Sequence, residues 1–113
     1  MKDFLFIFRN DFTAPTAPTP EQMQGMMKLW MDWIGGIAAQ NKLTDKGNRL
    51  GFGGKVVRSN DFVTDGPFAD LKEIVSGYII VKAENFDEAA EMSKGCPILN
   101  IGGSVEVREV IAM

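Results

Sequence analysis

Histidine is absent from this 113-residue sequence, and cysteine occurs once, at Cys96. A cysteine nucleophile usually depends on a neighbouring base such as histidine, and a zinc site needs a cluster of histidines and cysteines. We therefore expect no metal site, no cofactor and no catalytic role for Cys96. A Mg²⁺ ion bound by the carboxylates of Asp65, Asp70 or Glu73 stays open as an alternative, although nothing in their spacing asks for it. A single cysteine cannot close an internal disulfide bond, which is typical of a reducing compartment, so we expect a cytoplasmic protein.

Long apolar runs and an excess of positive charge are also missing. No run approaches the roughly 20 apolar residues of a membrane-spanning helix, and the N-terminus lacks the pattern of a signal peptide. The net charge is −3, whereas nucleic-acid binders usually place a basic stripe against the phosphates. We expect neither a membrane nor a direct nucleic-acid partner.

The overall composition is typical of a single globular domain, which we expect to span residues 1–113. Apolar residues make up 45% and charged residues 24% of the chain, close to the average of folded proteins. Positive charge gathers in residues 42–58, where Asp45 is the one carboxylate. The cations of this segment are Lys42, Lys46, Arg49, Lys55 and Arg58. Such a patch attracts an anionic ligand or an acidic partner, or it is a solvated basic hairpin, which is the commoner case.

Hydrophobic periodicity predicts six elements in the order strand, helix, strand, strand, helix, strand. They span residues 4–8, 20–38, 50–58, 73–82, 86–94 and 104–111. This βαββαβ order is that of an α+β ferredoxin-like domain, in which the first and third strands are central. Those are the two strands whose apolar runs do not alternate, as burial on both faces requires. Glycines between residues 47 and 54 predict a bulge in the second, edge strand.

Capping signals and residue spacing define the two helices. Thr19, Pro20 and Gln22 form a capping box with proline at the first helical position, and Asn85 caps the second helix. Apolar residues recur along the first helix at three- and four-residue spacing. They are Met23, Met26, Met27, Trp30, Ile34, Ile37 and Ala38. We expect this whole stripe to pack in the core rather than to form an adaptable binding groove.

The predicted fold leaves one face of the sheet without a cover, because two helices can cover only the other. Phe4, Phe6 and Phe8 alternate with Leu5 and Ile7, so an apolar set stays on the open face whichever set faces the helices. An uncovered apolar sheet face is a liability for a protein in water. A two-fold dimer that places sheet against sheet removes it, so we expect a homodimer.

A more specific signal is the run V-T-D-G-P-F-A-D-L-K-E-I-V-S-G-Y over residues 63–78, followed by F-D-E-A-A-E, G-C-P and G-G-S-V-E-V-R. With these motifs nearly the whole chain resembles the YCII-related proteins of the DGPF type. The resemblance implies a ferredoxin-like fold paired as a dimeric α/β barrel, with a cleft between the sheets and a mostly unassigned function. It also implies relatives that are encoded near, or fused to, alternative sigma factors, and others that act as small-molecule lyases.

Related branches with an enzymatic site carry a His-Asp pair, so a site in this chain would use carboxylates, arginine or tyrosine instead. We single out Asp65 and Glu73 as candidate catalytic residues. Asp65 begins the Asp-Gly-Pro-Phe turn, which is alternatively a rigid corner between two strands. Glu73 stands at the mouth of the most apolar strand. In an intersheet cleft, loss of water would favour its protonated form and make it a usable general acid or base.

Glu106, Arg108 and Tyr78 are the candidate ligand-binding residues. Glu106 and Arg108 share one face of the last strand, and valines occupy the other face. If the valines face the helices, the two charged side chains face the cleft, where Arg108 can bind a carboxylate or phosphate bidentately. The alternative is a surface ion pair worth under about 1 kcal/mol. Tyr78 either donates a hydrogen bond to a ligand or packs.

Two functions follow from these observations. The first is a dimer that binds a small anionic organic molecule in the intersheet cleft, with acid/base chemistry through Glu73 and Asp65. The second is a non-catalytic dimer that engages a regulatory protein partner, such as an alternative sigma factor. The sequence leaves both open.

Overall fold

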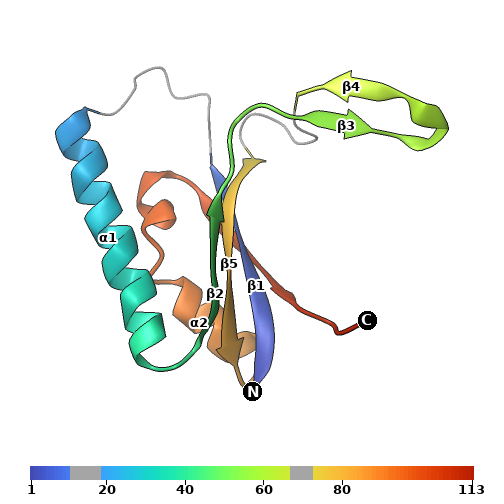
Figure 1. The fold of residues 1–113 in the computed structure, drawn as a ribbon. Coiled ribbons are helices and arrows are strands. Elements are labelled where there is room, and N and C mark those ends of the chain that lie inside the picture. The colour runs from blue at the N-terminus through green and yellow to red at the C-terminus, as the bar shows by residue number, and fades with distance from the viewer. Residues whose placement is uncertain (11–18, 67–72) are drawn as a thin grey trace.

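The computed structural model describes residues 1–10, 19–66 and 73–113, and it contains a four-stranded antiparallel sheet with two helices on one face (Figure 1). The strand order is β2-β5-β1-β6. The strands are β1 (Lys2–Asn10), β2 (Leu43–Arg49), β5 (Ile74–Ala83) and β6 (Ser104–Glu109), and the helices are α1 (Pro20–Ala39) and α2 (Phe86–Ser93). A short 3-10 turn, Pro97–Ile101, precedes β6. The fold is therefore α+β and ferredoxin-like, with β1 and β5 central, as the apolar runs predicted.

The core lies between the sheet and the helices, and aromatic rings fill its centre. Phe4, Phe6 and Phe8 of β1 are at most 4% exposed. The Phe8 ring meets that of Trp30 edge to face with 4.8 Å between centroids, and the Phe6 ring stacks on that of Trp33 at 6.2 Å. Such pairs contribute about 0.5–1.5 kcal/mol each beyond the burial of area. The aromatic side chains of β1 thus hold α1 against this face.

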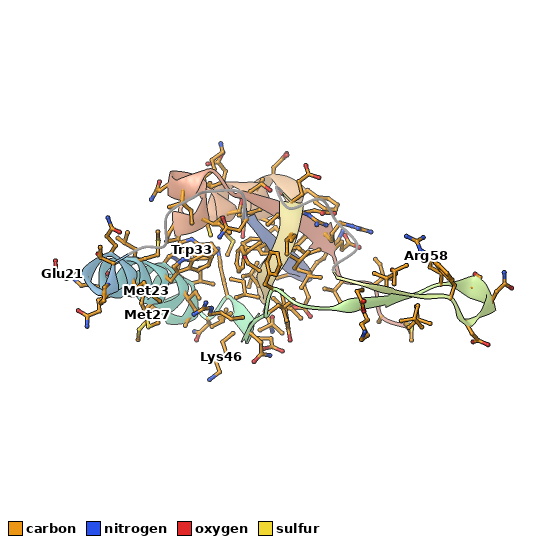
Figure 2. All side chains as sticks on the ribbon, turned by 90° about the horizontal axis from the view of Figure 1, so that it is seen from above. Glu21, Met23, Met27, Trp33, Lys46 and Arg58 are labelled. Atoms are coloured by element: carbon orange, nitrogen blue, oxygen red, sulfur yellow. The ribbon has the colours of Figure 1, made fainter. Side chains whose placement is uncertain are left out.

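The first turns of α1 do not pack on the sheet. The capping box at Thr19 and Gln22 is present as predicted, and Ile37 near the other end of the helix is buried. Met23 and Met27, in contrast, are 51% and 54% exposed (Figure 2). The expectation that the whole apolar stripe packs in the core was therefore wrong. The reason is the tilt of α1, which leans away from the sheet toward its N-terminus in Figure 1 and has no strand beneath its first turns.

The second strand lies earlier in the chain than the predicted residues 50–58. It is β2, a polar edge strand, and its pairing with β5 is interrupted by register shifts. Gly47 lies at this irregularity with a φ of +66°, and its amide donates a hydrogen bond of 2.8 Å to the Asp45 carboxylate. A Cβ on Gly47 would lie 1.6 Å from the Tyr78 carbonyl oxygen. The predicted bulge is present at Gly47, whereas Gly51, Gly53 and Gly54 lie after the strand. The position of the strand was missed because a strand that lies largely in water has no apolar run to mark it.

Residues 50–66 form a hairpin that we call the arm. In it β3 (Lys55–Val57) pairs antiparallel with β4 (Val63–Asp65), and the 3-10 turn Ser59–Asp61 lies between them. The two strands form a separate two-stranded sheet and have no extensive contact with any other described element. Both figures show the arm projecting from the molecule on the side opposite to α1. The residues predicted to form the second strand of the main sheet therefore belong to the arm instead.

Candidate functional site

The face of the sheet opposite the helices is open and partly apolar. The phenylalanines of β1 point toward the helices, so the alternate residues Leu5 and Ile7 point to the other side. The strand register places Leu5 opposite Ile80 and Ile7 opposite Tyr78. All four residues are only partly buried. Together they form a surface that we call the apolar floor, defined as Leu5, Ile7, Tyr78 and Ile80.

Two charged residues of β6 stand beside the apolar floor. Val105 and Val107 pack against the core, so Glu106 and Arg108 between and after them face the open side. The register places Glu106 opposite Ile7 and Arg108 opposite Leu5. The valines therefore face the helices, and with them in the core the two charged side chains lie on the open face, as predicted.

Arg9, at the end of β1, organises this edge of the floor. Its guanidinium donates to one carboxylate oxygen of Glu106 through Nη2 at 3.0 Å and Nε at 3.3 Å. Its remaining nitrogen, Nη1, donates to the backbone carbonyl of Glu73 at 3.0 Å. The Arg108 guanidinium approaches the other Glu106 oxygen at 3.4 Å. We call Arg9, Glu106 and Arg108 the arginine cluster.

The charge state of Glu106 follows from this cluster. The hydrogen bonds from Arg9 hold the pKa of the Glu106 carboxyl below its ordinary value, and Arg108 adds to the effect. Desolvation acts in the opposite direction and is outweighed. Glu106 is therefore a carboxylate at neutral pH. The carboxylate contacts both guanidinium groups, and a carboxylate held by arginine is a poor proton donor.

A hydrogen bond between side chains marks the opposite side of the apolar floor. Asn48 of β2 donates from its side-chain amide to the hydroxyl oxygen of Tyr78 at 3.1 Å, and the two residues are paired in the strand register. The Tyr78 hydroxyl keeps its own proton free to donate onward. The floor thus lies between a cationic edge on β6 and a hydroxyl on β5.

The two candidate catalytic carboxylates lie in different places. Glu73 directly precedes β5 and is exposed, and Arg9 holds the Glu73 backbone carbonyl beside the arginine cluster. Asp65 ends β4 in the arm, where its carboxylate pairs with the Lys55 ammonium and is 90% exposed. Within the chain, the described contacts bring Glu73 to the cluster and leave Asp65 on the arm. The rest of the predicted turn, residues 67 and 68, lies outside the described residues.

Sequence reasoning missed Arg9 and Asn48. The signal for Arg9 was its position as the first charged residue after the apolar run of β1. A cation at the end of a strand that is central in the sheet has neighbours on both sides, and Arg9 uses them. Asn48 carried no signal, because β2 was not recognised as a strand.

Other parts of the molecule fit an anionic ligand less well. A shallow groove of about 380 Å³ runs between α1 and α2, but among the residues that line it Asp32 and Glu91 are the charged ones. The Cys96 side chain is buried, which raises the pKa of its thiol to about 12, so it is a poor nucleophile. Within residues 1–10, 19–66 and 73–113 there is no cluster of acidic, histidine or cysteine side chains that could hold a metal. In the same ranges, no helix is long and apolar enough to cross a membrane.

Comparison with known proteins identifies the family. Residues 22–113 match the YCII-related domain. This chain belongs to the YCII-related family. The resemblance drawn from residues 63–78 is thereby confirmed. The matched range begins after β1, although β1 occupies the centre of the YCII-related sheet in this chain.

Individual relatives add little to this assignment. No curated protein matches the sequence. Among solved structures, this YCII-related chain is similar to the 5-chloro-2-hydroxyhydroquinone dehydrochlorinase from Burkholderia phenoliruptrix AC1100 in complex with 2,5-dihydroxybenzoquinone. The TM-score is 0.46 and the sequence identity 17%, over 97% of this chain and 95% of the other. At this distance the likeness carries no argument about a shared ligand or reaction.

Proposed function

We propose that this YCII-related protein is a homodimer that binds a small anionic organic molecule over the open face of its sheet. The observation that carries the proposal is the arginine cluster beside the apolar floor. Two guanidinium groups share one carboxylate there, so the cluster retains an excess of positive charge. An excess cation next to an apolar surface is the arrangement that selects an organic anion over an inorganic one.

Within the cluster, Arg108 is the residue that we assign to the ligand. Its side chain is 67% exposed and its one contact to Glu106 is long, at 3.4 Å. Arg9, in contrast, is committed to Glu106 and to the Glu73 carbonyl. Arg108 can therefore turn toward a carboxylate or phosphate and bind it bidentately without breaking the structure of the cluster.

The size of the floor limits the ligand. One strand, β1, lies between β5 and β6, so Tyr78 and the cationic edge are about 10 Å apart across the sheet. A molecule with one apolar ring or chain and an acidic group fits this span. Its anionic group would contact Arg108, and a hydroxyl or carbonyl at its other end would meet Tyr78.

A second copy of the chain completes the site. In one copy the apolar floor faces water, which weakens the attraction between Arg108 and an anion. A dimer that places one sheet over the other excludes water from the floor and covers its apolar side chains. The site is then the cleft between two sheets.

For acid/base chemistry on the bound ligand we propose Glu73, because Arg9 fixes its backbone beside the cluster while its side chain remains exposed. Asp65 is the second candidate. It serves this role only if the arm of one copy reaches the site of the other, since in its own chain it pairs with Lys55 on the arm.

The test is thermal unfolding of the purified protein in the presence of a panel of aromatic and aliphatic organic acids, which detects ligand binding as an increase in stability. A ligand at about one hundred times its dissociation constant adds about 2.7 kcal/mol to the free energy of unfolding. We expect at least one acid to stabilise the protein, and Arg108→Ala to abolish that effect. Lys94→Ala is the matched control, because Lys94, at the C-cap of α2, is a similarly exposed cation, at 69%.

Glu73→Gln separates binding from chemistry. With a stabilising acid in hand, we expect this variant to keep the thermal shift and to lose any conversion of the ligand. A panel without a single stabilising acid, or a shift that persists in Arg108→Ala, would refute the anion site. In that case a dimer that still forms would favour the accessory role with a regulatory protein partner.

A further inference from the structure

The arm, residues 50–66, is too small to be stable as it stands in one copy. It contains two strands of three residues each and has no extensive contact with the rest of the described chain. An isolated two-stranded hairpin is marginally stable in water and needs a third strand or a packing surface. Stability of the arm therefore requires a packing surface that the described residues of one copy do not supply.

The side chains of the arm point to the same conclusion. Five large apolar residues of the arm are between 45% and 70% exposed, namely Leu50, Phe52, Val57, Phe62 and Val63. Single exposed apolar residues are ordinary on a protein surface. Five of them within 14 residues, on a hairpin of only two short strands, are an unusual density of exposed apolar side chains, as is typical of an interaction surface.

The shape of the chain agrees with an arm that reaches outward. The radius of gyration is 15.5 Å, whereas a compact domain of this length has a value of roughly 13 Å. The excess comes from the arm and from the first turns of α1, which extend on opposite sides of the sheet. In Figure 2 the labelled Arg58 lies near the tip of the arm, far from Trp33 in the body.

We propose that the arm packs against a second copy of this chain. Each exposed apolar side chain of the arm offers about 100 Å², so one arm offers about 500 Å². In a two-fold dimer the two arms contribute about 1,000 Å² and the surfaces that they cover contribute about the same, which is the size of a stable interface. The arm also begins directly after β2, the strand that pairs with β5, and β5 carries half of the apolar floor. A copy that covers the open face is therefore within reach of the arm.

This inference rests on the homodimer of the proposed function. The experiment therefore distinguishes a failure of the arm contact from a failure of the homodimer itself. Val57→Cys places a thiol on the arm at a position that is 70% exposed in one copy. The native Cys96 is buried and does not interfere. The reaction rate of the new thiol with an aromatic disulfide reagent is measured over a range of protein concentrations, and light scattering reports the mass of the same samples. Lys94→Cys, at the C-cap of α2 and 69% exposed, is the control.

We expect the arm thiol to react at least about tenfold more slowly in dimeric than in monomeric samples, while the control thiol reacts equally in both. Val57→Asp should in addition weaken the dimer by at least about tenfold, because it buries a charge in the interface. An arm thiol that reacts rapidly in dimeric samples overturns the inference and leaves the dimer intact. Protection in monomeric samples also overturns it, because the arm would then pack on its own chain. An undiminished dimer in Val57→Asp overturns it as well, because the arm would then lie outside the interface.

Discussion

Removal of the Arg9 guanidinium tests the arginine cluster most directly. Arg9→Met keeps the apolar stem of the side chain and deletes the contacts to the Glu106 carboxylate, at 3.0 and 3.3 Å, and to the Glu73 carbonyl, at 3.0 Å. The ion pair has side chains 29% and 37% exposed, so it belongs at the upper end of the about 0.2–1 kcal/mol of exposed pairs. The carbonyl hydrogen bond adds about 0.5–1.5 kcal/mol. We expect a loss of about 1.5–2.5 kcal/mol at neutral pH.

The ion-pair part of this loss depends on pH, and its sign is fixed by the Glu106 pKa. Arg9 lowers the pKa of the Glu106 carboxyl in the folded state. A carboxyl with a lowered folded-state pKa contributes stability above its unfolded pKa and loses it as the pH falls through the folded value. The contribution of the Arg9–Glu106 pair should therefore be complete at neutral pH and disappear in acid, whereas the hydrogen bond to the Glu73 carbonyl persists.

The assay is urea unfolding of a double-mutant cycle, Arg9→Met with Glu106→Gln, at neutral pH and near pH 3, at one protein concentration. We expect a coupling free energy of about 0.5–1 kcal/mol at neutral pH and a smaller value near pH 3. The control is the Lys94–Glu91 pair, whose side chains are 69% and 70% exposed, and its coupling should be smaller. Equal coupling at both pH values, or none at neutral pH, would refute the reasoning.

Three further predictions test the fold. Gly47→Ala should lower the free energy of unfolding in urea by about 2–4 kcal/mol, because its φ is +66° and a Cβ would clash with a backbone oxygen of β5. Gly66→Ala, at φ +83° in open space, should lower it by only about 1 kcal/mol. Equal losses would argue against the bulge. Phe6→Ala should lower the free energy of unfolding, measured by thermal unfolding, by about 3–5 kcal/mol. Met31 is 68% exposed, so Met31→Ala should lower it by less than about 0.5 kcal/mol. The reverse order would place the core elsewhere. The Cys96 thiol should react with a thiol reagent only after unfolding, since burial raises its pKa to about 12; prompt reaction of the native protein would contradict its burial.

The central part of the fold was predictable because its physical causes are local in the sequence. The runs at residues 4–8 and 73–82 are apolar on both faces, and only central strands of this sheet need that. Helix starts are also set by neighbouring residues, and the caps at Thr19 and Asn85 occur as expected. The alternation in β6 fixed which side of the sheet Glu106 and Arg108 occupy.

The remaining parts depend on contacts between distant residues. β2 is a strand because its backbone pairs with β5, and its polar sequence gives no sign of that pairing. Met23 and Met27 carry the same helical spacing as Ile37, but the tilt of α1 decides which of them reach the sheet. Arg9 meets Glu106 across 97 positions of the chain. Residue spacing along the sequence contains no information about such a meeting.

The position of β1 between β5 and β6 also governs how the chain assembles during synthesis. β1 is the first strand to be made, but its two partners begin at residues 74 and 104. Pairing across so many residues is slow, because the entropy of closing the loop is lost before any contact compensates for it. Until then the phenylalanines of β1 stand on a strand with two open edges, which invites association with other chains. A chain truncated before β6 should therefore aggregate or be retained by chaperones, so that its activity cannot be measured.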